Sequence, residues 1–138
     1  MKPLLSLILL TFIFTSGCKK AIEKEKERQL MAAITDGVWF IEQFKEKNTD
    51  ITASFSDYSF RFYEDGKVEG IRTGQPTETG TWKGDLLSKT IDAQFAQAGD
   101  PLNKVNGIWK ITDSYSNYVE ANMPVTGGKN ILHLRKRE

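Results

Sequence analysis

Short runs in which apolar and polar residues alternate fill the chain from Gly37 onward. In Tyr58-Ser59-Phe60-Arg61-Phe62 every second residue is apolar, and the same period of two recurs at 90–95 and 130–135. Because successive side chains of a strand point to opposite faces, this pattern predicts strands with one buried face. We expect eight strands, at about residues 37–45, 55–63, 67–73, 78–83, 89–96, 106–113, 116–122 and 130–136.

Turn-forming residues separate these runs. Glu64-Asp65-Gly66 indicates a tight hairpin, and all three prolines that follow Cys18 fall in such breaks. No helical stretch of useful length lies between the strands, so consecutive antiparallel pairing is expected rather than parallel crossovers. Eight short antiparallel strands form either a closed up-and-down barrel or a sandwich. Closure would remove the sheet edges that promote aggregation.

The alternation also assigns an inward face. The first strand is ambiguous, because Val38 and Phe40 on one side and Trp39 and Ile41 on the other are all apolar. Beyond residue 17 the chain holds three Trp, four Tyr and six Phe, which favours a well-filled interior with a shallow pocket at one mouth. The expected inward set is Trp39, Ile41, Tyr58, Phe60, Phe62, Trp82, Phe95, Trp109, Leu132 and Leu134.

The first 17 residues have a different pattern. Lys2 is followed by the run 4–14, in which nine of eleven residues are apolar, and then by Thr15-Ser16-Gly17-Cys18. A basic start, an apolar core too short to span a bilayer and small residues at its end indicate a signal peptide. The four residues ending in Cys18 resemble the lipobox of bacterial lipoproteins. This resemblance implies removal of residues 1–17 and acylation of Cys18, whereas an ordinary secretory signal would leave that cysteine incidental.

The same resemblance implies a location. It places the protein in the bacterial cell envelope, held to a membrane through the lipid on Cys18. Two or three buried acyl chains anchor a protein stably, since each buried methylene contributes about 0.8 kcal/mol. We expect the outer membrane, with the folded domain facing the periplasm.

Residues 18–35 are predicted to be a charged, helical tether that leads to a domain over 36–138. Eight of the ten residues at 19–28 are charged, with interleaved signs that permit helical ion pairs. Leu30, Ala33 and Ile34 form an apolar face that could dock on the domain. A solvated spacer accounts for the charges. A patch for anionic lipid or for a partner is the alternative, and the near balance of signs argues against lipid.

Composition limits the chemistry of this 138-residue chain. With 19 basic and 18 acidic residues it carries a net charge of +1, which argues against nucleic acid as a partner. A single cysteine excludes an internal disulfide and a thiolate zinc cluster. The single histidine, His133, alternates with Leu132 and Leu134 and should face solvent. No nucleotide-binding, esterase or zinc-protease motif is present, so we expect no enzyme, no cofactor and no metal site.

Five segments together resemble the lipocalin, or calycin-type, superfamily, and in particular the small lipocalin-like domains of bacterial lipoproteins. They are GVWFI (37–41), SFRFYEDGKV (59–68), TGTWKG (79–84), LNKVNGIWKI (102–111) and ILHLRK (131–136). The resemblance implies an all-β, eight-stranded antiparallel up-and-down barrel that Gly37 and Trp39 close at one end. It also implies that a basic residue near the end of the last strand, Arg135 or the nearby Arg137, packs across the Trp39 indole.

Two functions remain open. The first is a membrane-anchored protein that binds a small apolar or amphiphilic ligand, with cavity-lining candidates Tyr58, Phe60, Phe62, Trp82, Phe95 and Trp109. The second is a filled-barrel interaction module, which binds an envelope protein or glycan through the loops 45–54, 97–105 and 123–129. The interior volume separates the two, because an open apolar chamber favours the ligand and a packed core favours the interaction module.

Overall fold

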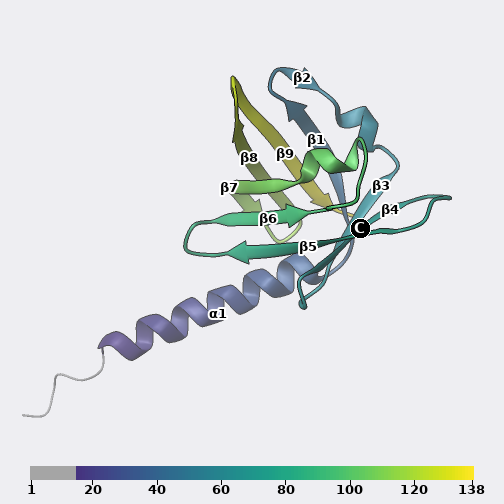
Figure 1. Cartoon of the computed structure of the whole chain (residues 1–138). Coiled ribbons are helices and arrows are strands. Elements are labelled where there is room, and N and C mark those ends of the chain that lie inside the picture. Colours follow the sequence, from purple (N-terminus) through teal and green to yellow (C-terminus); the bar gives the residue numbers. More distant parts are fainter. Residues whose placement is uncertain (1–14) are drawn as a thin grey trace, which may run out of the picture.

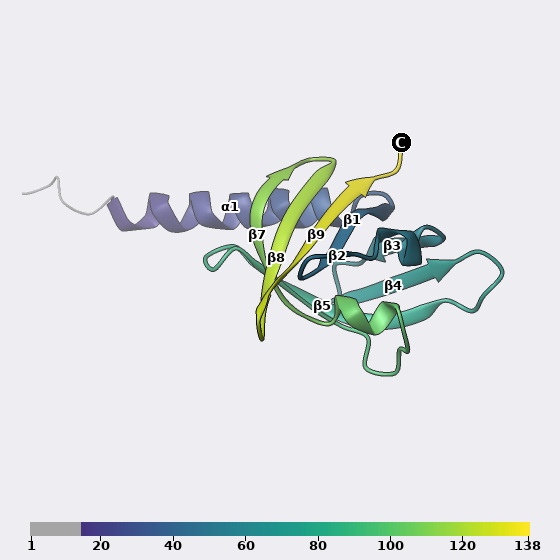
Figure 2. The same cartoon turned by 90° about the horizontal axis from the view of Figure 1, so that it is seen from above.

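The computed structural model describes residues 15–138, which form a helix followed by an antiparallel β-barrel (Figures 1 and 2). The apolar core of the predicted signal peptide, residues 4–14, lies outside the described residues. The elements are α1 (Thr15–Thr35), β1 (Trp39–Glu46), β2 (Thr49–Asp50), the 3₁₀ helix η1 (Thr52–Phe55), β3 (Tyr58–Phe62), β4 (Lys67–Arg72), β5 (Glu78–Asp85), β6 (Thr90–Gln94), the 3₁₀ helix η2 (Leu102–Val105), β7 (Gly107–Tyr115), β8 (Tyr118–Val125) and β9 (Gly128–Lys136).

Eight of these strands form the barrel. They pair in the order β1-β3-β4-β5-β6-β7-β8-β9, and β9 returns to β1, so the sheet is closed. The closing seam runs from the pair Trp39 and Lys136 to the pair Lys45 and Ile131. The two-residue strand β2 extends the sheet beside the end of β1. The predicted eight-stranded antiparallel up-and-down barrel is therefore confirmed.

The three segments predicted as unpatterned loops contain regular structure. Segment 45–54 holds β2 and most of η1, and η1 delays the start of β3 from the predicted residue 55 to Tyr58. Segment 97–105 holds η2. Segment 123–129 is a tight hairpin, because β8 continues to Val125 and β9 begins at Gly128. Single turns of 3₁₀ helix bury apolar residues without a period of two, which hid them from the strand pattern.

A bulge in β1 resolves the ambiguity of the first strand. The register with β9 shifts between Ile41 and Gln43. Before the bulge Trp39 and Ile41 face the interior, and after it Phe44 does, while Glu42 is exposed. A bulge adds one residue to one strand and so moves the following side chains to the other face. An eight-residue strand can thus carry apolar residues at both odd and even positions and still turn all of the buried ones toward the interior.

The helix α1 meets the barrel through its C-terminal turns. Ile34 is buried in the core, and Leu30 and Met31 pack against the core from the same helix. The rest of α1 runs outward beside β5 (Figure 1), with an ion pair of 2.6 Å between Glu25 Oε1 and Arg28 Nη2 on its surface. Within residues 15–138, no helix combines the length and the apolar character that a membrane crossing requires.

The two ends of the barrel are named here by what covers them. The helix end is the one where β1 begins and β9 finishes, next to the C-terminus of α1. The cap end is the opposite one, where η1 and η2 connect the strands.

Candidate ligand cavity

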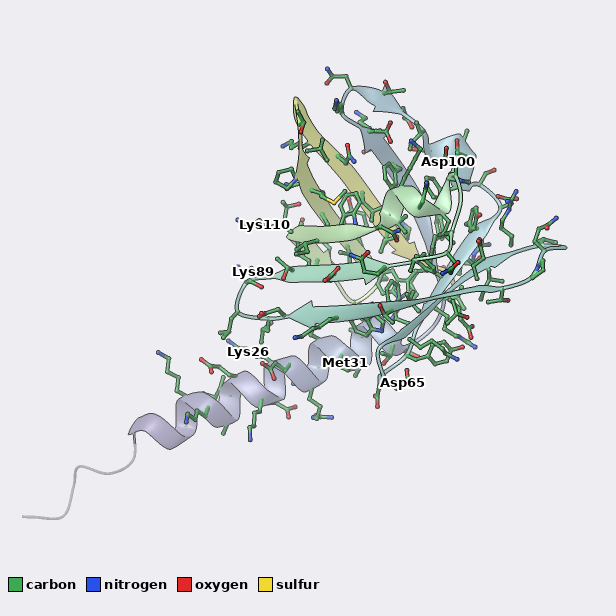
Figure 3. The ribbon with its side chains drawn as sticks, viewed as in Figure 1. Lys26, Met31, Asp65, Lys89, Asp100 and Lys110 are labelled. Carbon is green, nitrogen blue, oxygen red and sulfur yellow. The ribbon has the colours of Figure 1, made fainter. Side chains whose placement is uncertain are left out.

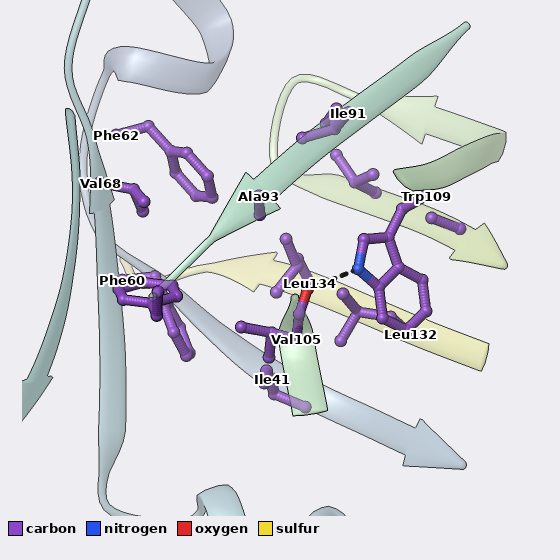
Figure 4. Close-up of a pocket in the computed structure, with 13 residues that line it drawn as sticks. Ile41, Phe60, Phe62, Val68, Ile91, Ala93, Val105, Trp109, Leu132 and Leu134 are labelled. Carbon is purple, nitrogen blue, oxygen red and sulfur yellow. Dashed lines mark hydrogen bonds between the residues drawn. The ribbon is translucent and has the colours of Figure 1, made fainter. Parts of the chain in front are cut away.

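A narrow apolar cavity of about 50 Å³ lies inside the barrel (Figure 4). All 13 of its lining residues are apolar, and most occupy alternate positions of barrel strands. They are Ile41, Phe60, Phe62, Val68, Ile91, Ala93, Phe95, Val105, Trp109, Val119, Ala121, Leu132 and Leu134. A space with such walls offers water no hydrogen-bond partner, so it is suited to apolar atoms or to remaining empty.

The sequence identified part of this lining. Among the six aromatic candidates, the structure places Phe60, Phe62, Phe95 and Trp109 on the wall of the cavity. The strand pattern could also have placed Val68, Val119 and Ala121 there, but the prediction considered only aromatic side chains. Val105 gave no signal of this kind, because it lies in η2.

The other two candidates, Tyr58 and Trp82, are buried but do not line the cavity. The ring of Tyr58 packs beside that of Phe55, with 5.9 Å between their centroids. Trp82 donates its indole N–H to the carbonyl oxygen of Tyr63 over 2.8 Å. Both rings therefore belong to the packing at the margins of the interior.

Trp109 is the one tryptophan on the wall of this cavity, and its polar atom is already satisfied. Its Nε1–H donates to the carbonyl oxygen of Val105 over 2.8 Å (Figure 4). Across residues 18–138, no buried side-chain nitrogen or oxygen lacks a hydrogen-bond partner. The cavity can therefore hold a guest through shape and apolar contact, and its walls carry no polar group that would orient one.

Apolar side chains from η1 and η2 close the cap end. Phe55 of η1 stacks on Phe44 with 5.1 Å between ring centroids, and Leu102 of η2 has no exposed surface. Lys104 of η2 pairs with Glu46 at the end of β1, with 2.7 Å between Nζ and Oε2. The hydrogen bond to Glu46 raises the pKa of Lys104. One partly exposed ion pair thus accompanies a plug made mainly by packing.

Trp39 closes the helix end. It donates its indole N–H to the carbonyl oxygen of Ile34 over 2.9 Å, which ties the barrel to the last turn of α1. Gly37 just before it has a φ of +85°, a conformation that favours glycine. A Cβ at Gly37 would come within 3.2 Å of Lys136 Cδ, so the glycine also leaves room for that lysine.

The basic residue over Trp39 is Lys136, and the role implied for Arg135 is corrected. Lys136 Nζ lies 5.1 Å from the centre of the indole and donates to the Ala33 carbonyl oxygen over 2.9 Å. Arg135 points to the outer wall, where its guanidinium lies 4.8 Å from the centre of the Tyr118 ring. Side chains alternate along β9, so residue 136 shares the inward face of Leu132 and Leu134, and residue 135 does not.

His133 also lies on the outer wall, as its alternation predicted, but it is half-buried in a side-chain cluster. Its Nδ1 is 3.2 Å from the hydroxyl oxygen of Tyr118, and its Nε2 is 3.8 Å from Oε2 of Glu120. Burial, and then the hydrogen bond to Glu120, raise the pKa of Tyr118. Within residues 15–138, no group of three or more His, Cys, Asp or Glu side chains could hold a metal ion.

A second hollow, of about 300 Å³, lies between α1 and β5 on the outside of the barrel. Figure 3 shows Met31 on the part of α1 that lies next to β5, and Lys26 farther toward the free end of the helix. Its lining mixes charged and apolar residues: Glu27, Leu30, Met31, Ile34, Trp82, Lys83, Gly84, Asp85 and Leu86. The outer groove and the inner cavity are therefore separate places, with different chemistry.

Comparison with known proteins supports the fold and not a family. No protein-family model matches the chain, and no curated protein matches it. A crystal structure of a DUF4847 family protein from Bacteroides vulgatus has a similar fold, with a TM-score of 0.56 and 16% identity over 79% of this chain and 99% of that one. At this identity the likeness establishes the fold alone.

A second similar structure is Japanin from Rhipicephalus appendiculatus, in a crystal form with bound cholesterol. It superposes with a TM-score of 0.56 and 7% identity, over 75% of this chain and 76% of that one. Together with the closed eight-stranded sheet, these neighbours support the lipocalin-like barrel that the sequence motifs implied.

Proposed function

We propose that this protein is a lipid-anchored, lipocalin-like protein of the bacterial cell envelope that holds one slender apolar or amphiphilic molecule in its barrel. The observation that carries the proposal is the interior cavity, whose walls are entirely apolar. Japanin, a structural neighbour, holds cholesterol. A lipocalin-like barrel is typically a binding fold, and this site gives its guest apolar contacts and no catalytic group.

The size of the cavity limits the guest. Pockets for drug-sized molecules measure roughly 300–1,000 Å³, whereas this one measures about 50 Å³. A single unbranched hydrocarbon chain is the guest that needs the least widening. Burial stabilises such a chain by about 0.8 kcal/mol for each methylene, which can offset modest movement of wall side chains. A polar head group would remain outside the apolar walls.

Trp109 provides the test, because it lines the cavity while Trp39 and Trp82 do not. The intact chain is titrated in a neutral detergent with a fatty acid brominated near its methyl end, a short-range quencher of indole fluorescence. We expect saturable quenching that the unbrominated fatty acid reverses. The Trp109→Phe variant should lose most of this quenching, whereas the matched Trp82→Phe variant should retain it.

Two outcomes would count against the interior site. Quenching that survives Trp109→Phe and disappears with Trp82→Phe would place the chain in the outer groove, which Trp82 lines. An absence of saturable quenching with any chain length would remove the ligand proposal. Circular dichroism of each variant checks that the barrel is intact before either result is interpreted.

The anchor is a separate part of the proposal. Cys18 is exposed on α1, in the part of the helix that leads away from the barrel. The resemblance to a lipobox supports its acylation, in the outer membrane with the barrel facing the periplasm. Labelling of cells with an alkyne fatty acid should mark the wild-type chain and leave Cys18→Ala unmarked. If the wild-type chain took up no label, the anchor would be refuted and the cavity proposal would stand.

The small cavity volume also favours a second candidate, the filled-barrel interaction module. In this alternative the barrel binds an envelope protein or glycan through the cap-end segments 45–54, 97–105 and 123–129, without an interior ligand. Cross-linking in intact membranes through cysteines placed at Ala53 or Lys129, both exposed, should then capture one discrete partner. A cysteine placed at Thr79, on the outer wall of β5, is the matched control. If it cross-linked the same partner equally well, the reaction would be non-specific.

A further inference from the structure

A stack of three side chains crosses the outer wall of the barrel and ends in an open face. Tyr118 on β8 lies between Arg135 on β9 and Tyr115 on β7, and the strand register pairs it directly with both residues. The guanidinium of Arg135 is 4.8 Å from the centre of the Tyr118 ring. The ring of Tyr115 is 6.3 Å from that of Tyr118, at an angle of 29°. Tyr115 is 66% exposed, so its ring is available to a further group.

Two carboxylates lie beside this open ring. Asp113 precedes Tyr115 by two residues on the same face of β7 and is directly opposite Glu120 of β8. Like charges that face each other across two strands destabilise a sheet. A cation placed between Asp113 and Glu120 would remove this repulsion. We name the three residues Asp113, Tyr115 and Glu120 the Tyr115 surface.

The same barrel combines a tyrosine ring, a cation over the ring and a carboxylate paired with that cation three times, twice on the outer wall and once at the buried ring of Tyr58. The distances from cation to ring centre are 4.1, 5.0 and 4.8 Å, and those from cation to carboxylate are 3.2, 3.0 and 2.7 Å. In the same order, the three sets are Tyr63, Lys67 and Glu69; Tyr58, Arg72 and Asp57; and Tyr118, Arg135 and Glu42.

The Tyr115 surface has the ring and the Asp113 carboxylate of this arrangement without the cation. Glu120 is partly engaged, because its Oε2 accepts a hydrogen bond from the Tyr118 hydroxyl over 3.2 Å and lies 3.8 Å from His133 Nε2. In the described part of the chain, no cation lies over the Tyr115 ring and no ion pair includes Asp113. The Asp113 carboxylate accepts a hydrogen bond from the backbone N–H of Ser114, which holds it in place. The core-facing residues of α1, Leu30, Met31 and Ile34, line the groove beside β5, and Tyr115 stays 66% exposed.

We propose that the Tyr115 surface binds an arginine side chain presented by a partner protein. A planar guanidinium can stack on the Tyr115 ring and direct its N–H groups at Asp113 and Glu120, as Arg135 does with Tyr118 and Glu42. The two carboxylates repel phosphate, which argues against nucleic acid and anionic lipid. Tyrosine and arginine are also enriched where protein interfaces gain most of their affinity. This site is independent of the interior cavity.

The test uses the isotope-labelled intact chain in a neutral detergent micelle. The probe is a capped Gly-Arg-Gly peptide, and its matched control is the same peptide with citrulline, which keeps the shape of arginine and removes the charge. We expect saturable shifts of the backbone amides around residues 113–120 with the arginine peptide, and binding about tenfold weaker with citrulline.

Variants of the chain locate the site. Tyr115→Ser and Asp113→Asn should each weaken binding of the arginine peptide about fivefold to tenfold. Tyr63→Ser is the matched control, because it removes a tyrosine whose cation is already in place, and it should leave binding unchanged. Equal binding of the citrulline peptide, no shift at 113–120, or full binding by Tyr115→Ser would overturn the proposal. Shifts of these amides by an N-acetylglucosamine oligomer alone would assign the surface to a glycan instead.

Discussion

The two ends of the barrel are closed by different kinds of contact. At the helix end, directional hydrogen bonds from Trp39 and Lys136 reach the backbone of α1 at Ile34 and Ala33. At the cap end, the apolar side chains of Phe55 and Leu102 fill the opening from single turns of 3₁₀ helix. A buried indole hydrogen bond is present at both ends, and the ends differ in what it reaches: the long helix α1 at Ile34 at the helix end, and the single 3₁₀ turn η2 at Val105 at the cap end.

This difference indicates which end yields first. A buried hydrogen-bonded indole leaves both partners unsatisfied when it is displaced, but a four-residue 3₁₀ turn such as η2 can move as a unit more easily than the 21-residue helix α1. Local opening with a low free energy occurs in short segments that bury few residues, and η1 and η2 have four residues each. We therefore expect the cap end to open more readily than the helix end, and the following variants measure that contrast.

Trp39→Ala should have the largest effect. It removes a fully buried indole and leaves the carbonyl oxygen of Ile34 without its partner. We expect a loss of about 3–5 kcal/mol in the free energy of unfolding, measured by chemical denaturation. Tyr63→Ala is a surface control that should cost much less. A loss below about 1 kcal/mol for Trp39→Ala would mean that Trp39 does not secure this end.

Leu102→Ala should come second. It empties a position without exposed surface in the plug, so we expect a loss of about 2–4 kcal/mol. Unlike Trp39→Ala, it should also strengthen binding of the brominated fatty acid, because the new space adjoins the interior. Weaker binding in a variant that remains folded would show that the cap end is not a route to the cavity.

Lys136→Met should have an intermediate effect. Its comparison with Arg135→Met distinguishes the contributions of two neighbouring basic residues to stability. Losing the cation over Trp39 and the hydrogen bond to Ala33 should cost about 1–2 kcal/mol. Arg135→Met, on the more exposed outer wall, should cost less than about 1 kcal/mol. The reverse order would restore the closing role to Arg135 and contradict the contacts described for Lys136.

Glu46→Gln should have the smallest effect on stability, below about 0.5 kcal/mol, because its ion pair with Lys104 is partly exposed. Its local effect should be faster hydrogen exchange of the η2 amides. The folded chain raises the pKa of Lys104, so the contribution of the pair is present at neutral pH and is lost as the pH rises through that raised pKa. Unchanged exchange at η2 would show that the pair does not hold the cap.

Prediction from sequence succeeded where one local rule acts alone. A period of two placed eight strands and the inward residues of β3 and β9, because each of these strands buries a single face. It could not place Phe44, since the β1 bulge reverses parity within the strand. Phe55, Leu102 and Val105 were missed, because 3₁₀ turns bury side chains without alternation.

The error over Arg135 has a different origin. The alternation of Leu132 and Leu134 already places Lys136 on the inward face of the last strand. The resemblance to lipocalins led instead to an arginine, and Arg135 lies on the opposite face. The volume of the cavity also could not be predicted. It depends on how the side chains of seven strands and η2 interdigitate, and no residue pattern along one strand reports that packing.

Nuclear Overhauser effects between decanoic acid and the methyl groups of the intact chain would show directly whether an apolar chain lies inside the barrel. We expect contacts from the chain of the fatty acid to the methyl groups of Ala121 and Leu132, which line the cavity. Contacts confined to Leu30 and Leu86, which line the outer groove, would contradict it. So would an absence of contacts at concentrations that saturate the quenching of Trp109.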